Sequence, residues 1–325
     1  MEDNQGLQFQ MQILHHKKND IRPISYLDNM LDILKSTGYE WLVVIYGGEP
    51  FLYPDFINIC LKLTQFFKVE ILTNLSLSNE IREFSDKVDP SRIIIRTSTH
   101  IEERLIKNNI EEYVDNILLL RKKGFSVYPG YVLHPELWSR FEDDSRYFIS
   151  RGIKLYPTAY KGWYGMKMYP NAYSAKERAF ISENNPGLRF YPVSLKGIEC
   201  DAGRRYILID EGGTVYRCAN DFTVIGNMDD SVNFYNTSIP CKVHMCSCQG
   251  LDLIGNKAEL VKKKYRTAYS YWRFLLYGTK ADYRIQWFHD ITKFIRIFCY
   301  AVRDSRFNFI RKIRQAGCGD INIRK

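Results

Sequence analysis

The sequence predicts an α/β protein built on a parallel sheet, open or curled into a partial barrel. Between residues 25 and 158, short aliphatic runs alternate with longer segments of helical periodicity. The aliphatic runs are nearly continuous, as expected for parallel strands that are covered on both faces. A strand, helix, strand order at this rhythm gives parallel strand pairs joined by right-handed crossovers.

The first elements set the pattern. Ser25 can cap a helix whose apolar residues recur at helical spacing, and Gly38 can end it in the left-handed conformation. A strand with the sequence WLVVIY follows at 41–46. The same reasoning predicts helices at 54–67, 79–88, 101–123 and 136–151, and strands at 69–73, 92–97, 126–133 and 153–158. Ligands of such sheets bind beyond the carboxyl ends of the strands, so the loops that follow the strands are the candidate sites.

Composition narrows the class of protein. The chain has 325 residues, of which 45% are hydrophobic and 26% charged, which excludes collagen-like and largely disordered chains. No apolar run approaches the ~18 residues of a membrane span. Residues 1–12 are polar and do not resemble a signal peptide. We therefore expect a cytoplasmic protein.

The positive charge is concentrated at one end. Residues 256–325 contain 17 basic and 5 acidic side chains, a net charge of +12, whereas residues 1–255 contain 29 basic and 32 acidic ones, a net charge of −3. This basic, aromatic and helical tail fits two interpretations. It covers the open side of the body, or it lies on an anionic membrane surface or an acidic partner. No nucleic-acid reading motif accompanies the charge, so nucleic acid is not an expected partner.

Polar and glycine residues follow several of the predicted strands. The turn after the 41–46 strand is Gly47-Gly48-Glu49-Pro50, in which two glycines allow the backbone to approach a ligand closely. By itself this turn is more typical of a tight connection into the next helix. The other polar residues at predicted strand ends are Thr73, Asn74, Ser98, His100 and His134. We expect the two histidines to be exposed loop residues, with contact to substrate as the alternative.

Five of the eight cysteines fall between residues 200 and 248. In a reducing compartment, such clustering indicates metal ligands more readily than disulfides. Two thiols bracket a predicted hairpin with strands at 206–209 and 214–217, and the others lie in a short loop. Four thiolates suit an iron–sulfur cluster or a structural zinc, and the spacing alone does not separate these metals. The candidate ligands, five residues for four positions, are Cys200, Cys218, Cys241, Cys246 and Cys248.

Taken together, the turn and the cysteine cluster resemble the radical S-adenosylmethionine (radical SAM) family. Its motif after the second strand is GGEP, and the spacing Cys200, twelve residues, Gly213, four residues, Cys218 is similar to its SPASM or twitch extension. The resemblance implies a partial parallel (β/α) barrel of radical SAM type, an auxiliary 4Fe–4S cluster and an electron donor. It also implies that S-adenosylmethionine is bound by Gly47, Gly48, Glu49, Pro50, Thr73, Asn74 and Ser98. Relatives of this kind modify peptides, proteins or small molecules by abstracting hydrogen.

One part of the family pattern is missing. The family binds its catalytic cluster through Cys-x3-Cys-x2-Cys after the first strand, but the first cysteine of this chain is Cys60, on the apolar stripe of a predicted helix. Residues 3–10 have the family's spacing with every thiol replaced, and the alternation from Leu7 to Ile13 equally predicts a short strand. Either an otherwise ordinary enzyme lacks its first strand and cluster loop, or the chain is a degenerate relative.

The predicted organisation therefore has three parts. Residues 1–185 form the radical-SAM-like partial barrel with its first strand and cluster loop missing or degenerate. Residues 186–255 form the auxiliary cluster domain, and residues 256–325 form the tail. The competing function, from a different class, is a noncatalytic metal-binding scaffold that docks a partner or a membrane surface through the tail.

Overall fold

The structure is a computed structural model that describes residues 7–12, 26–53, 55–185, 195–243 and 246. The chain divides into two compact units. The first comprises 1–162 and 169–262. The second comprises 163–168 and 263–325, of which only the first segment is described. The predicted tail at 256–325 lies outside the described residues.

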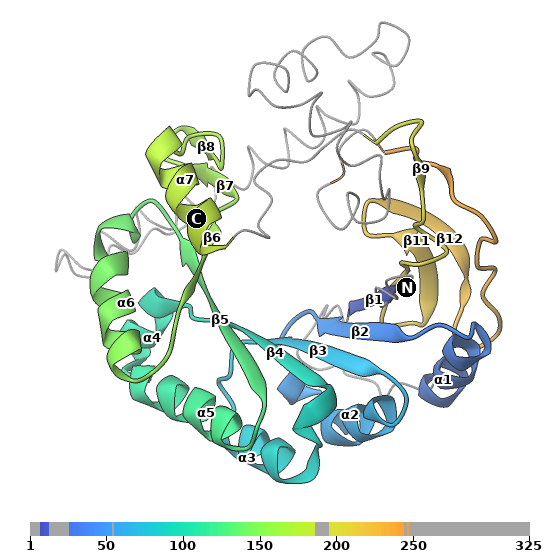
Figure 1. The fold of residues 1–325 in the computed structure, drawn as a ribbon, viewed down its shortest axis with the longest axis horizontal. Helices are drawn as coiled ribbons and strands as arrows, with labels where there is room; N and C mark the ends of the chain where they lie inside the picture. The colour runs from blue at the N-terminus through green and yellow to red at the C-terminus, as the bar shows by residue number, and fades with distance from the viewer. Residues whose placement is uncertain (1–6, 13–25, 54, 186–194, 244–245, 247–325) are drawn as a thin grey trace, which may run out of the picture. The chain divides into compact units, whose positions relative to one another are not determined.

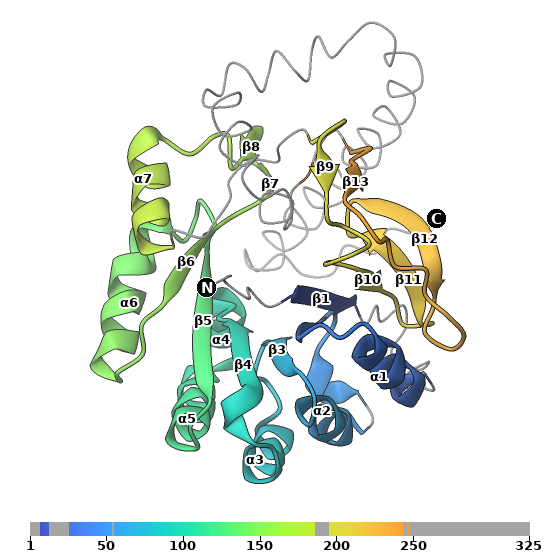
Figure 2. The same cartoon turned by 45° about the vertical axis from the view of Figure 1, so that its right-hand side comes forward.

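Six parallel strands form the centre of the first unit. They are β1 (Leu7–Gln12), β2 (Trp41–Tyr46), β3 (Lys68–Thr73), β4 (Ile93–Ser98), β5 (Ser126–Leu133) and β6 (Tyr156–Ala159), adjacent in that order. The helices between them are α1 (Leu27–Ser36), α2 (Phe56–Thr64), α3 (Ser78–Lys87), α4 (Ile101–Lys107), α5 (Ile110–Lys122) and α6 (Phe141–Ser150). All six helices lie on one face of the sheet (Figures 1 and 2). The described helices include none that is long and apolar enough to cross a membrane.

The core lies between the sheet and these helices. In β4, Ile93, Ile95 and Thr97 are buried, and the residues between them point to the opposite face. Aromatic rings fill the space under the helices: the centroids of Phe51 and Phe84 lie 5.3 Å apart. Among the described residues, helices cover the outer face alone, so the opposite face of β3 to β6 is the candidate face for a ligand.

The strand predicted from the alternating N-terminal pattern is confirmed as β1. It pairs in parallel with β2 from Leu7 to Gln12. A parallel strand therefore precedes β2 in the sheet. Residues 7–10 lie in this strand and not in a loop, and the segment that follows it, 13–25, lies outside the described residues.

Two predicted segments differ from the structure. The helix expected at 101–123 is two helices, because Asn108 adopts a left-handed conformation (φ 51°) at the end of α4. No helix or strand was predicted within 160–199, but this segment contains β7 (Gly162–Tyr164), β8 (Lys167–Tyr169) and α7 (Ala175–Asn184). Helix α7 begins with a reciprocal capping box in which Ser174 and Glu177 bond each other's backbone N–H groups.

The predicted hairpin extends the same sheet. Its strands are β10 (Leu208–Ile209) and β11 (Thr214–Cys218), joined by a turn in which Gly213 has φ 76°, and β12 (Asp221–Asn227) follows. Strand β10 pairs in parallel with β1, so β1 lies between β2 and β10. A separate two-stranded ladder is formed by β9 (Glu199–Cys200) and β13 (Ile239–Pro240).

Candidate functional site at the carboxyl ends of the strands

The turn after β2 has the geometry that its glycines permit. Gly47 has φ 114° and Gly48 has φ 51°, values that L side chains rarely adopt. Gly48 is exposed, whereas Glu49 and Pro50 are buried and begin a short 3-10 helix. The turn therefore presents backbone, and not side chains, at the edge of the sheet.

The carboxylate of Glu49 joins two neighbouring loops. It accepts a hydrogen bond of 2.6 Å from Thr73 Oγ1 and one of 2.7 Å from the backbone N–H of Asn74, both at the end of β3. A third, longer bond of 3.3 Å comes from the N–H of Phe51. Burial raises the pKa of Glu49, and the bonds from Thr73 and Asn74 oppose that shift. The structure thus brings together three residues that the sequence singled out: Glu49, Thr73 and Asn74.

Arg104 continues this network to the next strands. It is 4% exposed, and its Nε donates to the carbonyl oxygen of Thr99 at 2.6 Å while its Nη2 donates to the carbonyl oxygen of Asn74. Its guanidinium lies 3.8 Å from the ring centroid of Tyr113. Thr99 in turn donates from both N and Oγ1 to the carbonyl oxygen of Gly130 in β5. The loops after β2, β3 and β4 are therefore tied to one another and to β5.

Strained residues follow the same three strands. Asp55, Leu75 and His100 are non-glycine residues with φ between 44° and 59°, after β2, β3 and β4 respectively. Each such conformation costs about 1–2 kcal/mol and persists only where the surrounding contacts fix it. Strain of this kind concentrates at functional sites, which marks this edge of the sheet as the candidate site.

A hollow of about 280 Å³ adjoins this edge. Ser98, His100 and His134 all line it, so two histidines that the sequence placed in separate loops share one surface. The ring of His134 packs edge-on against Tyr160, with centroids 4.7 Å apart. Of the three polar residues predicted to bind S-adenosylmethionine at strand ends, Ser98 lines this hollow, whereas Thr73 and Asn74 contact Glu49.

The cysteine-rich part places four of its five thiols in the interior. Cys200, Cys218, Cys241 and Cys246 are buried, and Cys248 lies outside the described residues. Cys200 is the strand partner of Ile239 in the β9–β13 ladder, and Ile239 lies two residues before Cys241 in the sequence. Burial raises the pKa of the Cys200 thiol to about 11, and the nearby Cys241 adds to that shift. Cys60, in contrast, is a fully buried core residue of α2, as predicted.

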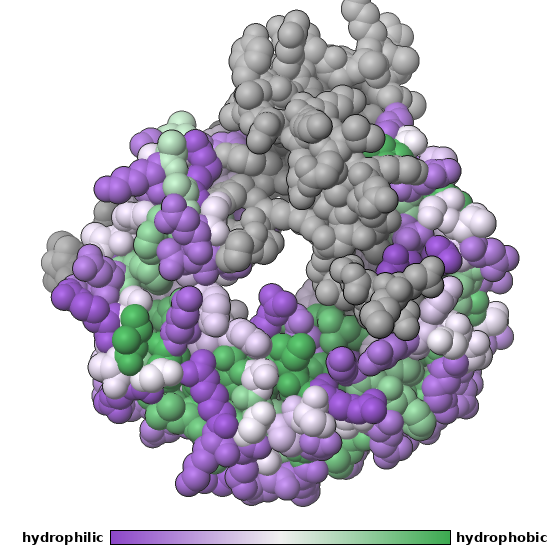
Figure 3. Space-filling view, viewed as in Figure 1, coloured by the Kyte–Doolittle hydropathy of each residue, from purple (hydrophilic) through white to green (hydrophobic). Residues whose placement is uncertain are grey.

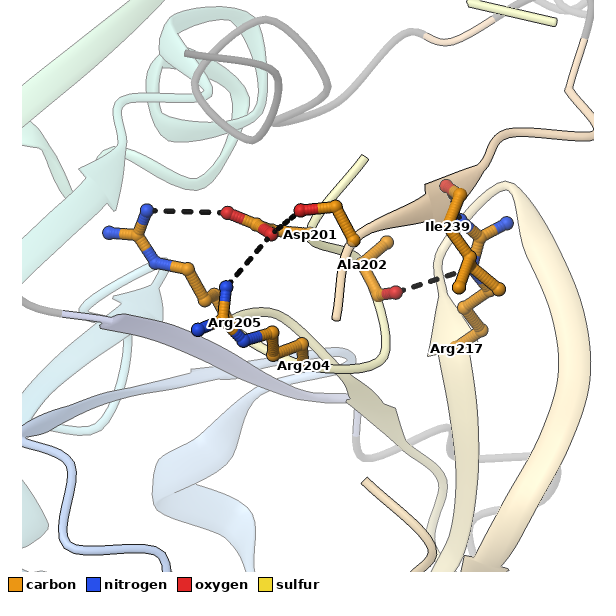
Figure 4. Close-up of polar contacts among 7 residues, drawn as sticks. Asp201, Ala202, Arg204, Arg205, Arg217 and Ile239 are labelled. Atoms are coloured by element: carbon orange, nitrogen blue, oxygen red, sulfur yellow. Dashed lines mark hydrogen bonds and ion pairs between the residues drawn. The ribbon is translucent and has the colours of Figure 1, made fainter. Parts of the chain in front are cut away.

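Arg217 holds together the segments that carry these thiols (Figure 4). It is 1% exposed and donates to the carbonyl oxygens of Ala202 and Ile239, each at 3.2 Å, and to Asp221 Oδ2 at 2.7 Å. Its neighbour in the chain is Cys218. A single buried side chain therefore connects the backbone beside Cys200, Cys218 and Cys241.

Asp201 makes a second connection in the same region. Its carboxylate lies 3.4 Å from the guanidinium of Arg204 and 3.4 Å from that of Arg205. It also accepts a hydrogen bond from Ser238, next to β13 (Figure 4). The residue after Cys200 thus fixes the loop that leads to Cys241.

The buried thiols of this region are suitable ligands for a metal, but the described residues do not bring enough of them together to form a complete metal site. Buried thiols are the ligands of iron–sulfur and zinc sites, and Cys200 and Cys241 are neighbours. Within the described ranges, however, no three His, Cys, Asp or Glu side chains lie close enough together to hold a metal ion. The assignment of Cys200, Cys218, Cys241, Cys246 and Cys248 as ligands stays a prediction.

Comparison with known proteins identifies the first part of the chain. Residues 12–148, from the end of β1 to α6, match the family described as the Radical SAM superfamily. The chain carries a radical SAM domain. This family implies S-adenosylmethionine and a 4Fe–4S cluster as cofactors. No curated protein matches the chain significantly in sequence.

Solved structures share the fold of this chain at low sequence identity. SuiB of Streptococcus suis bound to S-adenosylmethionine is 15% identical, with a TM-score of 0.51 over 70% of this chain and 62% of that one. SuiB bound to the precursor peptide SuiA is 14% identical, with a TM-score of 0.52 over 70% and 64%. This chain thus spans a little less than two thirds of the length of SuiB. Similarity to anSMEcpe with bound AdoMet has a TM-score of 0.46.

The sequence interpretation missed Arg104, Thr99 and Tyr113. Arg104 lies in a helix rich in charged residues, where an arginine is ordinarily exposed, so nothing local indicates its burial. A weak signal exists in its position, one helical turn after the strained His100 at the end of β4. Only the three-dimensional arrangement shows that it reaches two carbonyl groups from different loops.

Proposed function

We propose that this chain binds S-adenosylmethionine at the carboxyl ends of β2, β3 and β4 and that it binds a peptide. The observation that carries the proposal is the Glu49 carboxylate, which holds the Gly47–Gly48 turn against the end of β3. The turn leaves backbone groups exposed to an incoming amine, and Arg104 places a positive charge beside Asn74 for an incoming carboxylate. S-adenosylmethionine carries both groups.

Two further observations support a peptide substrate and an iron–sulfur centre. SuiB, which shares the fold, has been crystallised with S-adenosylmethionine and with a precursor peptide. Four cysteines of the Cys200 to Cys248 group are buried, as the ligands of an iron–sulfur centre would be. In radical SAM chemistry, S-adenosylmethionine bound to a reduced cluster supplies a 5′-deoxyadenosyl radical that abstracts a hydrogen atom from the substrate. The auxiliary centre would be held by the Cys200 to Cys248 group.

The catalytic cluster does not fit the residues present. Residues 1–59 contain no cysteine, and the segment after β1, 13–25, contains two histidines and no thiol. An iron–sulfur cluster needs thiolate ligands at most of its positions. We therefore derive no step through that cluster. This absence favours, as a second candidate function, a noncatalytic relative that binds S-adenosylmethionine, a metal or a partner without cleaving the cofactor.

Binding of S-adenosylmethionine tests the first part of the proposal. We expect Glu49→Gln to weaken binding of S-adenosylmethionine about tenfold in equilibrium dialysis. The substitution replaces one carboxylate oxygen by an NH2 group, which faces N–H and O–H donors and cannot accept their hydrogen bonds. Glu40→Gln is the matched control, since Glu40 is exposed and forms only a 3.8 Å ion pair with Lys68. Equal binding by the two variants would remove the support for this site.

Iron and product analysis tests the rest. After anaerobic reconstitution, we expect the protein to bind iron and sulfide, and Cys200→Ser or Cys241→Ser to reduce both. Cys60→Ala is the control, because Cys60 packs only in the core of α2. We expect no 5′-deoxyadenosine above a no-protein blank. Formation of 5′-deoxyadenosine would establish the enzyme and exclude the noncatalytic candidate.

A further inference from the structure

A second hollow lies on the face of the sheet that the helices do not cover. Its volume is about 300 Å³, and its walls come from β3, β4, β5 and β6. In Figure 3, described atoms border part of a central opening. The hollow adjoins the S-adenosylmethionine site proposed above, because Ser98 lines both hollows.

One row of side chains crosses three strands of this face. Leu72 pairs with Arg96 across β3 and β4, and Arg96 pairs with Tyr128 across β4 and β5. Paired residues in adjacent strands point to the same side, and all three are at least 36% exposed. They therefore form a continuous wall with a cation between an aliphatic and an aromatic side chain.

The floor of the hollow is backbone. Gly130 is the strand partner of Ser98 on one side and of Tyr156 on the other. With no side chain at this position, a gap stays open between two neighbours that both carry hydroxyl groups. A Cβ built on Gly130 meets nothing closer than the Thr97 carbonyl oxygen, at 3.5 Å, so the gap has room for an added side chain.

The charge of the hollow has one sign. Its described lining residues include a single charged side chain, Arg96, together with hydroxyl groups and the amide of Asn185. Arg96 Nε lies 2.8 Å from Glu70 Oε1, and the arginine side chain is still 62% exposed. Burial raises the pKa of Glu70, and the charge and hydrogen bond of Arg96 oppose that shift. A guanidinium has five N–H donors, so one ion pair leaves donors for a second carboxylate.

We propose that this hollow binds an acidic side chain of the peptide substrate, with its carboxylate on Arg96 and a neighbouring apolar side chain against Tyr128 and Tyr156. The two rings lie 5.7 Å apart and present an aromatic wall next to the cation. An apolar wall with one convergent charged group is the usual composition of a specific ligand pocket. The inference rests on the proposed function for the identity of the substrate as a peptide, but the pocket itself does not require S-adenosylmethionine to be present.

The test uses the full chain and three short peptides. Two are blocked at both ends, acetyl-Gly-Glu-Phe-Gly-amide and its glutamine analogue acetyl-Gly-Gln-Phe-Gly-amide. The third is the glutamine peptide with a free C-terminal carboxylate. We expect the blocked glutamate peptide to bind about tenfold more tightly than the glutamine peptide in NMR titrations, the gain of a charge-assisted hydrogen bond. Equal affinities of the two blocked peptides would overturn the proposal. If only the peptide with a free C-terminus binds more tightly, the hollow recognises a C-terminal carboxylate and not an acidic side chain, and the proposal is wrong.

Variants locate the binding. We expect Arg96→Gln to abolish the preference for glutamate and Gly130→Leu to weaken both blocked peptides by filling the hollow. Arg82→Gln is the control, since Arg82 is exposed on α3, on the covered face of the sheet. Retention of the glutamate preference by Arg96→Gln would overturn the assignment. Thermal unfolding of each variant confirms that it is folded. Gly130→Leu tests the hollow independently, because it fills the hollow without removing the charge of Arg96.

Binding of S-adenosylmethionine, measured in parallel, separates the two proposals. We expect Arg96→Gln to leave it unchanged. If the variant loses S-adenosylmethionine, the hollow belongs to the cofactor site and the present inference is wrong. If the unaltered protein prefers the glutamate peptide but does not bind S-adenosylmethionine, the proposed function fails and the acidic-peptide pocket stands.

Discussion

Two buried arginines, Arg217 in the cysteine-rich region and Arg104 at the strand ends, differ in whether a carboxylate forms an ion pair with them. Arg217 donates to the carboxylate of Asp221 at 2.7 Å, and although burial acts to lower the pKa of Arg217, this partner raises it. Arg104 donates to two backbone carbonyl groups, and no described carboxylate forms an ion pair with it. Burial lowers the pKa of Arg104.

The difference separates a structural cross-link from a site. Around Arg217, the positive charge is neutralised where it lies, and the side chain fixes three segments of backbone. Around Arg104, the hydrogen-bond partners are uncharged carbonyl groups, and the carboxylates of Glu103, Glu112 and Glu49 act on its charge without a described ion pair. The experiments below sharpen or break this distinction.

The largest effect is expected from Arg217→Met. The substitution leaves the 9%-exposed Asp221 carboxylate without its ion-pair partner, which typically costs about 3–5 kcal/mol. The free energy of unfolding from urea titrations measures this loss. Arg204→Met is the control, because the Arg204 contact with Asp201 is 3.4 Å long and partly exposed and contributes less than about 1 kcal/mol. Similar losses in the two variants would show that Arg217 is no special cross-link.

Arg104→Met is expected to cost less stability, about 2 kcal/mol. It removes two hydrogen bonds to carbonyl groups and leaves no carboxylate behind. Its main effect should be on ligand affinity: we expect weaker binding of S-adenosylmethionine, which Arg217→Met should not share while the protein is folded. Unchanged affinity in Arg104→Met would contradict the idea that its charge serves a ligand.

A pH-dependent effect is expected at Glu70. Because burial raises its pKa above the unfolded value, its contribution to stability is complete below the unfolded pKa and is lost as the pH rises through the folded pKa. Glu70→Gln imitates the protonated form and removes this dependence. The stability of the variant relative to the unaltered protein should therefore increase between pH 4 and pH 7. Urea titrations at both values measure the gain, and a constant difference would show that Glu70 ionises normally.

The smallest effect is expected from His100→Gly. Relief of the left-handed conformation at φ 44° is worth about 1–2 kcal/mol, and the extra freedom of glycine in the unfolded chain offsets most of it. A net stabilisation of about 0.5 kcal/mol should appear as a small rise in the urea midpoint. His134→Gly, which has no such relief to offer, is the comparison. A loss of stability in His100→Gly would mean that the imidazole makes contacts that outweigh the strain.

The predictable parts of the fold are those that are determined by residues close together in the sequence. The aliphatic runs predicted the residues of β2 and β5. Glu49, Thr73 and Asn74 lie together because the ends of β2 and β3 are adjacent in the sheet. Helix α7 was missed although Ser174 and Glu177 form a recognisable capping box. The break at Asn108 depends on a single left-handed residue that a helical pattern does not reveal.

Other features depend on residues far apart in the sequence. The burial of Arg104 arises from carbonyl groups of Asn74 and Thr99, which only the sheet brings within reach. The hollow around Arg96 depends on strand register and on the lack of a side chain at Gly130. Cross-strand neighbours of this kind are set by tertiary pairing and leave no periodic signal in the chain.

The position of β1 between β2 and β10 has a consequence for biosynthesis. Gln10 is paired with Leu208, so one side of the first strand has no partner until nearly two hundred further residues have been made. At roughly 5–20 residues per second, the ribosome needs about 10–40 s to supply it. During that interval the nascent chain exposes an unpaired strand edge. Capture of this edge by a chaperone, or by another nascent chain, competes with the final closing step.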